Sequence, residues 1–263
     1  MKMVSAAKLK GDENRLAAAI PFNKWALKLS SEPVLLDSLT TTYEDLPNKV
    51  LLVPFTSDKG LCGGVNTYIT RNAKDCVRKL TAQGKKCDIV IVGDKGRSQL
   101  RRDFRESIVR ATTDVIAPGN FSLAAALTSE IMAAGAATDY DAVVLMYNSF
   151  KNKATYNQRY KVIKPFVSQV EADESLAFYE FDSDKAELLQ DLYEFMLASQ
   201  VFHSFMDGAA SEQSSRMTAM ENASQNAKEM VAKLTLKYNR ARQSRITTEL
   251  IEIISGASAL DDK

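Results

Sequence analysis

Two glycine-bearing turns, residues 57–64 and 93–96, are the places where this sequence offers phosphate-binding chemistry. Each follows an apolar run typical of a strand, and backbone N–H groups after a strand can hold a phosphate. A phosphate-binding loop also needs Lys-Ser or Lys-Thr after its second glycine, and neither turn has it. The G-x-G-x-x-G motif is absent as well, so ordinary strand-to-helix turns are the favoured interpretation.

Other reactive side chains are few and isolated. His203 has no second histidine with which to share a metal, so we expect a packing or surface residue. Cys62 has no base beside it, which favours packing over reactivity. A group of carboxylates suits the solvated N-terminus of a helix better than acid-base catalysis. Its members are Glu171, Asp173, Glu174, Glu180, Asp182 and Asp184. We therefore expect no catalytic residue, no metal and no cofactor.

The composition is that of a globular chain and disfavours several classes of function. The chain has 263 residues, 45% hydrophobic and 25% charged, with a formal net charge of +1. This near-neutral charge gives no overall indication of nucleic-acid binding, which usually requires a net basic charge. No apolar run is long enough to span a bilayer, so we expect no direct membrane insertion. The 3 cysteines lack C-x-x-C spacing, which favours a reducing compartment over a disulfide framework.

The middle of the chain alternates between strand and helix patterns. Short apolar runs typical of buried strands lie at 50–53, 89–92 and 142–146, and helical stretches lie at 65–82, about 94–102 and 121–134. Asn120 or Ser122 is available to cap the last of these helices. The alternation predicts a small Rossmann-like, mainly parallel α/β domain over 48–183. A strand-like stretch at 160–170 is expected at one sheet edge, because Pro165 is poorly tolerated in a central strand.

Long helices are predicted at both ends. No proline follows Pro165, and apolar residues or alanine occupy eleven of fourteen positions in alternating steps of four and three from Leu188 to Leu234, with Ser199, Gln213 and Arg216 as the exceptions. A helix over 184–260 at about 1.5 Å per residue is too long to be enclosed by a domain of this size, so we expect it to project. Residues 1–29 form the predicted partner helix, with regular helix ending at Pro21.

The end of the long helix combines a basic collar with an apolar tip. The collar consists of Lys233, Lys237, Arg240, Arg242 and Arg245, with no acid between Glu229 and Glu249. The tip that follows is apolar around most of the helix and includes Ile246, Leu250, Ile251, Ile253, Ile254 and Leu260. A helix that is apolar all round must be buried, so we expect another protein to enclose it in an acidic ring and an apolar sleeve.

Two alternatives remain open at this point. A small α/β nucleotide-binding enzyme with a helical dimerisation arm would need a completed phosphate loop and a helix seam that pairs with itself. A nucleic-acid-binding arm would use the cations at 233–245. Such an arm usually also has aromatic side chains on which bases stack, and this segment has only Tyr238.

Five segments carry a family resemblance: 1–8, 57–64, 211–224, 234–243 and 246–257. Together they resemble the gamma subunit of F-type ATP synthases, of the mitochondrial type. The resemblance implies a non-catalytic rotor shaft, in which the N- and C-terminal helices form a long antiparallel coiled coil and the α/β domain forms the foot. It also implies as partners the alpha and beta subunits of the catalytic hexamer, the epsilon/delta-type central-stalk subunits and the membrane c-ring. The implied location is the matrix side of the mitochondrial inner membrane, peripheral to the bilayer.

The resemblance also assigns contact residues. Arg242, Gln243, Thr247 and Glu249 match family positions that contact a loop of the catalytic beta subunits. Met1 and Lys2 match the part of the N-terminal helix that passes the beta lever region. Ile246, Leu250, Ile253, Ile254 and Leu260 are then expected to form a hydrophobic bearing. The family's N-terminal helix begins well before the motif that opens this sequence, so we expect a chain truncated at its start.

Overall fold

The computed structural model describes residues 2–30, 32–36, 41, 43–115, 119–165, 182 and 184–261, without the side chains of 259–261. Its contacts divide the chain into two compact units, Met1–Ala219 and Met220–Lys263. The helix α5 (Lys185–Asp261) contributes to both. A single long C-terminal helix was predicted from the missing prolines, and this is confirmed.

Six strands form one sheet among the described residues, in the order β1-β6-β5-β2-β3-β4. They are β1 (Val34–Leu35), β2 (Lys49–Pro54), β3 (Lys86–Val92), β4 (Ile108–Thr112), β5 (Ala142–Phe150) and β6 (Tyr156–Ile163). Strand β2 pairs in parallel with both β3 and β5, and β3 pairs in parallel with β4. Strand β6 is antiparallel to β5 and to β1. The predicted mainly parallel α/β sheet is therefore confirmed.

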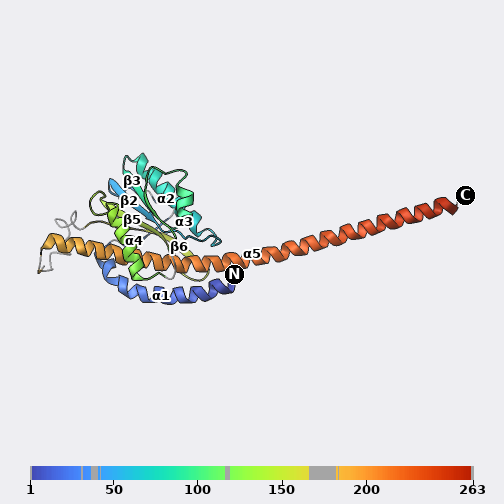
Figure 1. The fold of residues 1–263 in the computed structure, drawn as a ribbon, viewed down its shortest axis with the longest axis horizontal. Helices are drawn as coiled ribbons and strands as arrows, with labels where there is room; N and C mark the ends of the chain where they lie inside the picture. Colours follow the sequence, from blue (N-terminus) through green and yellow to red (C-terminus); the bar gives the residue numbers. More distant parts are fainter. Residues whose placement is uncertain are drawn as a thin grey trace. The chain divides into compact units, whose positions relative to one another are not determined.

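Alternating residues of the strands pack against helices on both faces of the sheet (Figure 1). One face carries Leu52 and Ile91, which pack with α2 (Val65–Ala82) and α3 (Asp94–Leu100). The other face carries Leu51 and Val90, which pack with α4 (Phe121–Ala133), α5 and the end of α1 (Lys2–Leu29). Strands buried on both faces consist of continuous apolar runs, and for this reason the positions of β2, β3 and β5 were predicted correctly from the sequence. The predicted cap is also confirmed, since Asn120 accepts a 2.9 Å hydrogen bond from the Leu123 N–H.

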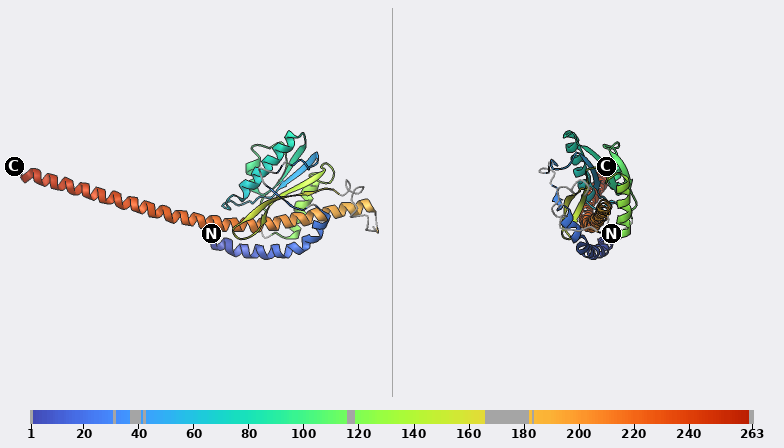
Figure 2. Two further views of the ribbon diagram at one scale, coloured as in Figure 1. Left: turned by 180° about the vertical axis from the view of Figure 1, so that it is seen from behind. Right: turned by 90° about the vertical axis from the view of Figure 1, so that its left-hand side faces the viewer.

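Helices α1 and α5 lie antiparallel and side by side in both orientations of the ribbon (Figure 2). Near the end of α1, Trp25 stacks on Phe195 with ring centroids 5.2 Å apart. Earlier in α1, Leu16 and Ala19 pack with Met206, further along α5. The predicted antiparallel pairing of the terminal helices is confirmed over this part of the chain.

The structure corrects the prediction that regular helix ends at Pro21, because α1 continues through that residue to Leu29. An interior proline removes one backbone hydrogen bond and costs about 3 kcal/mol in an isolated helix. In this fold the residues after it are held by packing, since Phe22 lies edge-on to Phe195 and Phe202. Tertiary contacts therefore override the local signal.

The predicted edge strand is also corrected. Strand β6 begins at Tyr156 and ends at Ile163, before Pro165, and residues 166–170 of the prediction lie outside the described residues. It is not at the edge, because Val34 and Leu35 of β1 pair with its Tyr160 and Arg159. Strands β1 and β4 are the true edges of the described sheet, and the sequence reading missed both.

Candidate functional site

The glycine turn after β2 is held by hydrogen bonds to the first turn of α2. Asn66 accepts a 2.9 Å hydrogen bond from the Ser57 N–H and donates one of 2.8 Å to the Ser57 hydroxyl. Gly63 has a φ of 62°, a backbone conformation that favours glycine. Gly63 is therefore explained by the backbone conformation of the turn, without a bound phosphate.

The second turn, after β3, leads into the short helix α3, where free N–H groups would be needed to bind phosphate. The Asp94 N–H donates instead to the Asp58 carboxylate at 2.9 Å. The Gly96 N–H donates to the Thr56 hydroxyl, also at 2.9 Å. Gly93 has a φ of 99°, and a Cβ there would lie 2.3 Å from the Thr56 carbonyl oxygen. Both turns therefore agree with the interpretation as strand-to-helix turns.

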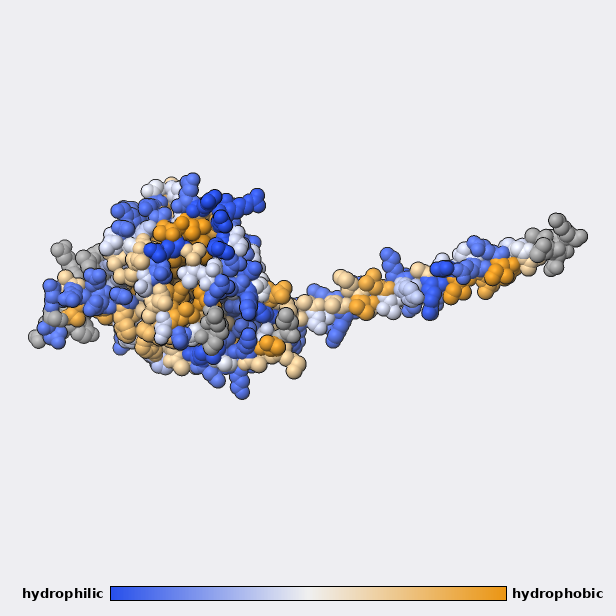
Figure 3. Space-filling view, viewed as in Figure 1, coloured by the Kyte–Doolittle hydropathy of each residue, from blue (hydrophilic) through white to orange (hydrophobic). Residues whose placement is uncertain are grey.

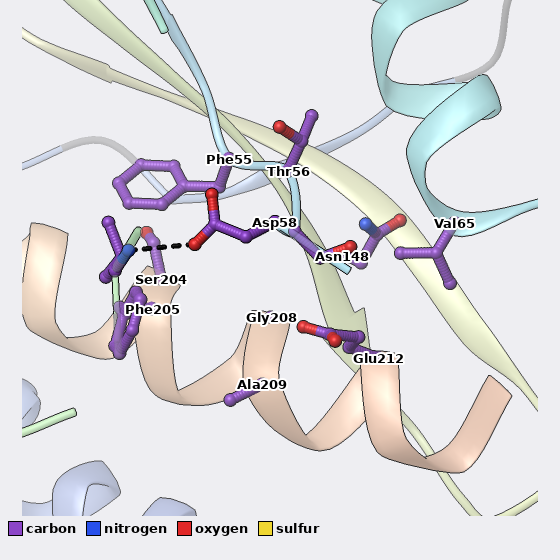
Figure 4. Close-up of a pocket in the computed structure, with 12 residues that line it drawn as sticks. Phe55, Thr56, Asp58, Val65, Asn148, Ser204, Phe205, Gly208, Ala209 and Glu212 are labelled. Atoms are coloured by element: carbon purple, nitrogen blue, oxygen red, sulfur yellow. Dashed lines mark hydrogen bonds between the residues drawn. The ribbon is translucent and has the colours of Figure 1, made fainter. Parts of the chain in front are cut away.

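A pocket lies at the carboxyl ends of β2 and β5 (Figure 4). In the sheet, β2 has β3 on one side and β5 on the other, so the strand order reverses at β2. Open α/β sheets commonly bind ligands in the crevice at such a reversal. In this chain Phe205 and Ala209 of α5 line the crevice. Two carboxylates, Asp58 and Glu212, also line it, and burial raises the pKa of Glu212. A phosphate would meet two acids here, which argues against the nucleotide-binding alternative.

The isolated reactive residues have structural surroundings. Cys62 is buried and accepts a 3.2 Å contact from the Asn66 amide, and burial raises the pKa of its thiol. Asp184 accepts a 2.9 Å hydrogen bond from the Ala186 N–H at the start of α5, as expected of a carboxylate at a helix N-terminus. Four of the other carboxylates, Glu171, Asp173, Glu174 and Glu180, lie outside the described residues. Within the described part of the chain no group of three or more His, Cys, Asp or Glu side chains is placed to hold a metal ion.

The distal part of α5, residues 221–258, is exposed along its length except at the half-buried Asn239. Apolar side chains recur on it between charged ones (Figure 3). The large exposed ones are Met230, Val231, Leu234, Leu236, Tyr238, Ile246, Leu250, Ile251, Ile253 and Ile254. Single exposed apolar residues are normal, whereas a continuous series of this kind marks an interaction surface. This distal stretch is the candidate functional site.

The predicted contact residues lie on this stretch. Arg242 and Gln243 are exposed, and the Thr247 hydroxyl donates to the Gln243 carbonyl oxygen at 2.9 Å. The sequence reading missed that Arg245 of the basic collar donates to Glu249, at 2.8 Å within the helix. The sequence could have indicated this ion pair, because opposite charges four residues apart on a helix lie close enough to interact.

The predicted bearing residues are also on this stretch. Ile246, Leu250 and Ile254 are each more than half exposed, and Ile253 is 72% exposed. Lys2 is the first residue of α1, in the other unit. Met1 and the side chain of Leu260 lie outside what the structure describes. The assignment of all these residues to partner contacts stays a prediction.

The sheet-facing side of α5 was missed by the sequence reading, which recognised only the seam from Leu188 to Leu234. That seam lies partly toward α1, as Met206 shows, whereas a second side of α5 is buried against the sheet, through apolar residues such as Leu197 and Val201 in its first part and through polar residues further along. We call six residues of this side the polar face. They are Gln200, Asp207, Ser211, Ser214, Ser215 and Arg216.

The polar face includes one buried ionisable group, Asp207, and contacts another, Lys161. Lys161 of β6 is 1% exposed and donates a 2.7 Å hydrogen bond to the Gln200 amide oxygen, and burial lowers its pKa to about 8. Asp207 accepts a 2.7 Å hydrogen bond from the Phe150 N–H, and burial raises its pKa to about 6. His203 lies between them in sequence. Burial and the positive charges of Lys161 and Arg159 lower its pKa to about 4, in agreement with a packing role.

Comparison with protein families gives a match over nearly the whole chain. The family model described as "ATP synthase" matches residues 1–260. The chain is 38% identical over 271 residues to the ATP synthase gamma chain of Pelagibacter ubique, covering 99% of this chain and 92% of the relative. It is 40% identical over 272 residues to the ATP synthase gamma chain of Rhizobium rhizogenes, with the same two coverages.

Solved structures give the same fold. A chain from the central stalk and c-ring of the Tetrahymena thermophila mitochondrial ATP synthase is 33% identical, with a TM-score of 0.68, covering 85% of this chain and 97% of that one. A chain from the rotor of the Euglena gracilis mitochondrial ATP synthase has a TM-score of 0.74 and covers 93% and 91%. At 20% identity this second likeness shows the fold alone. Across the residues that the structure describes, no helix is both long and apolar enough to cross a membrane.

Proposed function

The chain belongs to the ATP synthase gamma-chain family, and on that premise we propose that it is the non-catalytic central-stalk rotor subunit of an F-type ATP synthase. The observation that carries the proposal is the exposed apolar series on residues 221–258 of a chain that is similar over nearly its whole length to ATP synthase gamma chains. The resemblance of segments 211–224, 234–243 and 246–257 agrees with this family. The family also supports the other partners expected from the sequence, the epsilon/delta-type central-stalk subunits and the membrane c-ring.

The proposed mechanism follows from the asymmetry of the shaft. A helix with different side chains around its circumference presents a different surface to each of three otherwise equivalent beta subunits. A partner that binds one conformation better than another shifts the equilibrium toward it, so each beta site is biased toward a different state. Proton-driven rotation of the c-ring then changes which site is in which state. ATP is made or hydrolysed in the beta subunits, and this chain supplies no catalytic residue.

Specific contacts are proposed for the distal part of α5. Arg242, Gln243, Thr247 and Glu249 would meet a loop of the beta subunits, and Met1 and Lys2 would pass their lever region. Arg242 is an exposed cation with five N–H donors, which suits an acidic loop. The bearing residues Ile246, Leu250, Ile253, Ile254 and Leu260 would turn inside an apolar sleeve, because apolar contact has no preferred angle.

We also propose the division into domains and the location. Residues 1–29 and 184–260 form the shaft helices, and residues 48–183 form the foot. The complex is placed at the inner mitochondrial membrane with this chain on the matrix side. Support comes from the Tetrahymena mitochondrial structure, which is 33% identical, although the curated relatives named above are bacterial. Fractionation of the source cells, followed by carbonate extraction of the membranes, tests a peripheral matrix-side location.

The test of the proposed function is co-purification. A tagged copy of this chain, expressed in its source cells, should be recovered with three alpha and three beta chains per copy, and the isolated complex should hydrolyse ATP. Recovery of the chain alone or as a self-paired dimer would contradict the proposal and favour the enzyme with a dimerisation arm.

A further inference from the structure

Four of the six residues of the polar face of α5 are buried, which is unusual for hydroxyl, amide and carboxyl side chains, and the other two, Ser215 and Arg216, are half-buried. Gln200, Asp207, Ser211 and Ser214 are each at most 5% exposed. Their spacings of seven, four and three residues place them on one side of the helix. This side packs against strands β5 and β6 and the turns beside them.

Each member of the polar face is joined by hydrogen bonds to the α/β sheet or its turns. Gln200 accepts from Lys161 of β6 at 2.7 Å, and Asp207 accepts from the Phe150 N–H of β5 at 2.7 Å. The remaining bonds all go to backbone carbonyl oxygens. Ser211 donates to Asn148 at 3.1 Å, Ser214 to Lys153 at 2.7 Å, Ser215 to Cys62 at 2.6 Å, and Arg216 to Lys59 at 3.4 Å and Gly60 at 3.3 Å.

The side of α5 that faces α1 is different in kind. It meets α1 through rings and apolar side chains, such as Phe202 against Phe22 and Met206 against Leu16, and the buried side of α1 also carries the polar Ser5, Asp12 and Asn23. The Ser199 hydroxyl lies 3.5 Å from the Asn23 amide oxygen, which is long for a hydrogen bond. Apolar attraction has no directional requirement of its own, whereas a hydrogen bond weakens steeply once its angle falls below about 120°.

We propose that the polar face locks α5 in one rotational position against the sheet, so that torque passes between the α/β domain and α5 through these hydrogen bonds and not through α1. Turning α5 about its own axis would separate Lys161 and Phe150 from their acceptors while they remain buried. Burying such groups without partners is costly, and this cost opposes the turn. The inference rests on the proposed rotor function, because a helix that transmits no torque has no need of a lock.

The experiment uses the assembled ATP synthase in sealed vesicles, with the chain carrying either parental residues or substitutions. The lock variant is Asp207→Ala with Ser211→Ala and Ser214→Ala, which removes three hydrogen-bonding groups and keeps good helix formers. The matched control is Leu16→Ala with Met206→Ala, which weakens the α1 contact instead. The conservative variant is Asp207→Asn, because the asparagine oxygen can still accept from Phe150. ATP hydrolysis without a gradient and proton transport against a gradient are measured for each.

We expect the lock variant to hydrolyse ATP without a gradient at close to the parental rate. Its proton transport against a gradient should fall about tenfold or more, because three hydrogen bonds to the sheet and its turns are lost. The control and Asp207→Asn should keep parental coupling, even where the control unfolds at a lower temperature. Parental coupling in the lock variant, or equal uncoupling in the control, would overturn the proposal.

Two further outcomes are separated by the design. If the lock variant fails to assemble, the double substitution Ser211→Ala with Ser214→Ala carries the same test. If the parental chain itself neither assembles nor supports coupled transport, the proposed function fails, and this result is distinct from failure of the lock.

Discussion

The ring of His203 on α5 lies edge-on to the ring of Tyr147 on β5, with centroids 6.5 Å apart. The surrounding charges are Lys161 and Arg159 of β6, and Asp207 lies one turn further along α5. Lys161 and Asp207 are buried and His203 and Arg159 are half-buried at the contact between α5 and the sheet, so the protonation of this group is linked to folding.

The first prediction concerns His203. Its pKa is about 4 in the fold and 6.5 in the unfolded chain, so the folded state favours the neutral ring. Its contribution to stability is therefore present above pH 6.5 and is lost as the pH falls toward 4, by up to about 3 kcal/mol. His203→Gln should remove this component. Urea unfolding of the purified chain at several pH values between 7.5 and 4.5, compared with the parent, measures it.

Asp207 provides a second prediction with the opposite sign. Burial raises its pKa from 3.8 to about 6, so its contribution to stability is present at low pH and lost as the pH rises through 6. Asp207→Asn should stabilise the chain at pH 7 by up to about 3 kcal/mol. The difference from the parent should shrink toward pH 4. A stabilisation that does not change with pH would contradict the titration of this carboxyl group.

The third prediction is that the purified chain hydrolyses no ATP and binds it weakly. The N–H groups that begin α3 are occupied by Thr56 and Asp58, and the pocket beside them carries Glu212. Titration with a fluorescent ATP analogue and an assay of phosphate release check this. Saturable binding that is lost when Asp94 or Gly96 is substituted would show that the turn after β3 is a phosphate site after all.

The fourth prediction concerns the basic collar. If Arg242 meets an acidic loop of the beta subunits, Arg242→Glu should reverse a charge-assisted contact that contributes about 1.5–3 kcal/mol. The reconstituted complex should lose ATPase activity, while the circular dichroism of the free chain stays parental. Arg242→Lys keeps the charge and should lose less. A complex containing Arg242→Glu with parental turnover would count against this contact.

The sequence was informative where one physical signal dominated. Helix α2 was predicted at 65–82 and is observed as Val65–Ala82, because turns mark both ends and one side is apolar. Strand β4 was missed because it is half exposed, and β1 because two residues carry no periodicity. Polar side chains such as Gln200 and Ser211 hid the second buried face of α5, since periodicity counts polar residues as solvent-facing. Their burial depends on partners such as Lys161, which are distant in sequence.

The candidate site could be predicted from the sequence without knowledge of the fold that carries it. Apolar residues all round a helix predict burial by a partner, and this needs no knowledge of the sheet. The ion pair of Arg245 with Glu249 was overlooked because the cations were read as a collar and not tested against acids four residues away. The residues that contact the partner could be assigned only through the family, because the sequence of one chain does not contain the sequence or shape of its partner.

The last prediction concerns the bearing. Ile253 is 72% exposed in the chain alone, and Leu250 is more than half exposed, so their burial must come from the assembled complex. Each such side chain should then contribute roughly 1.5–3 kcal/mol on full burial. We expect Ile253→Leu to be tolerated, because the volume and apolar character are kept. Ile253→Asp should impair assembly and ATPase activity, because an unpaired carboxylate would be removed from water.

The two substitutions should be compared in the reconstituted complex, by the yield of assembled complex and by its ATPase rate. Asn222→Asp is a useful control, because it adds the same charge to an exposed position of α5 that lies outside the predicted bearing. If Ile253→Asp assembles and turns over like the control, the tip is not enclosed and the bearing residues are wrongly assigned. A loss confined to Ile253→Asp, with parental helix content in the free chain, places the defect at the partner's apolar sleeve.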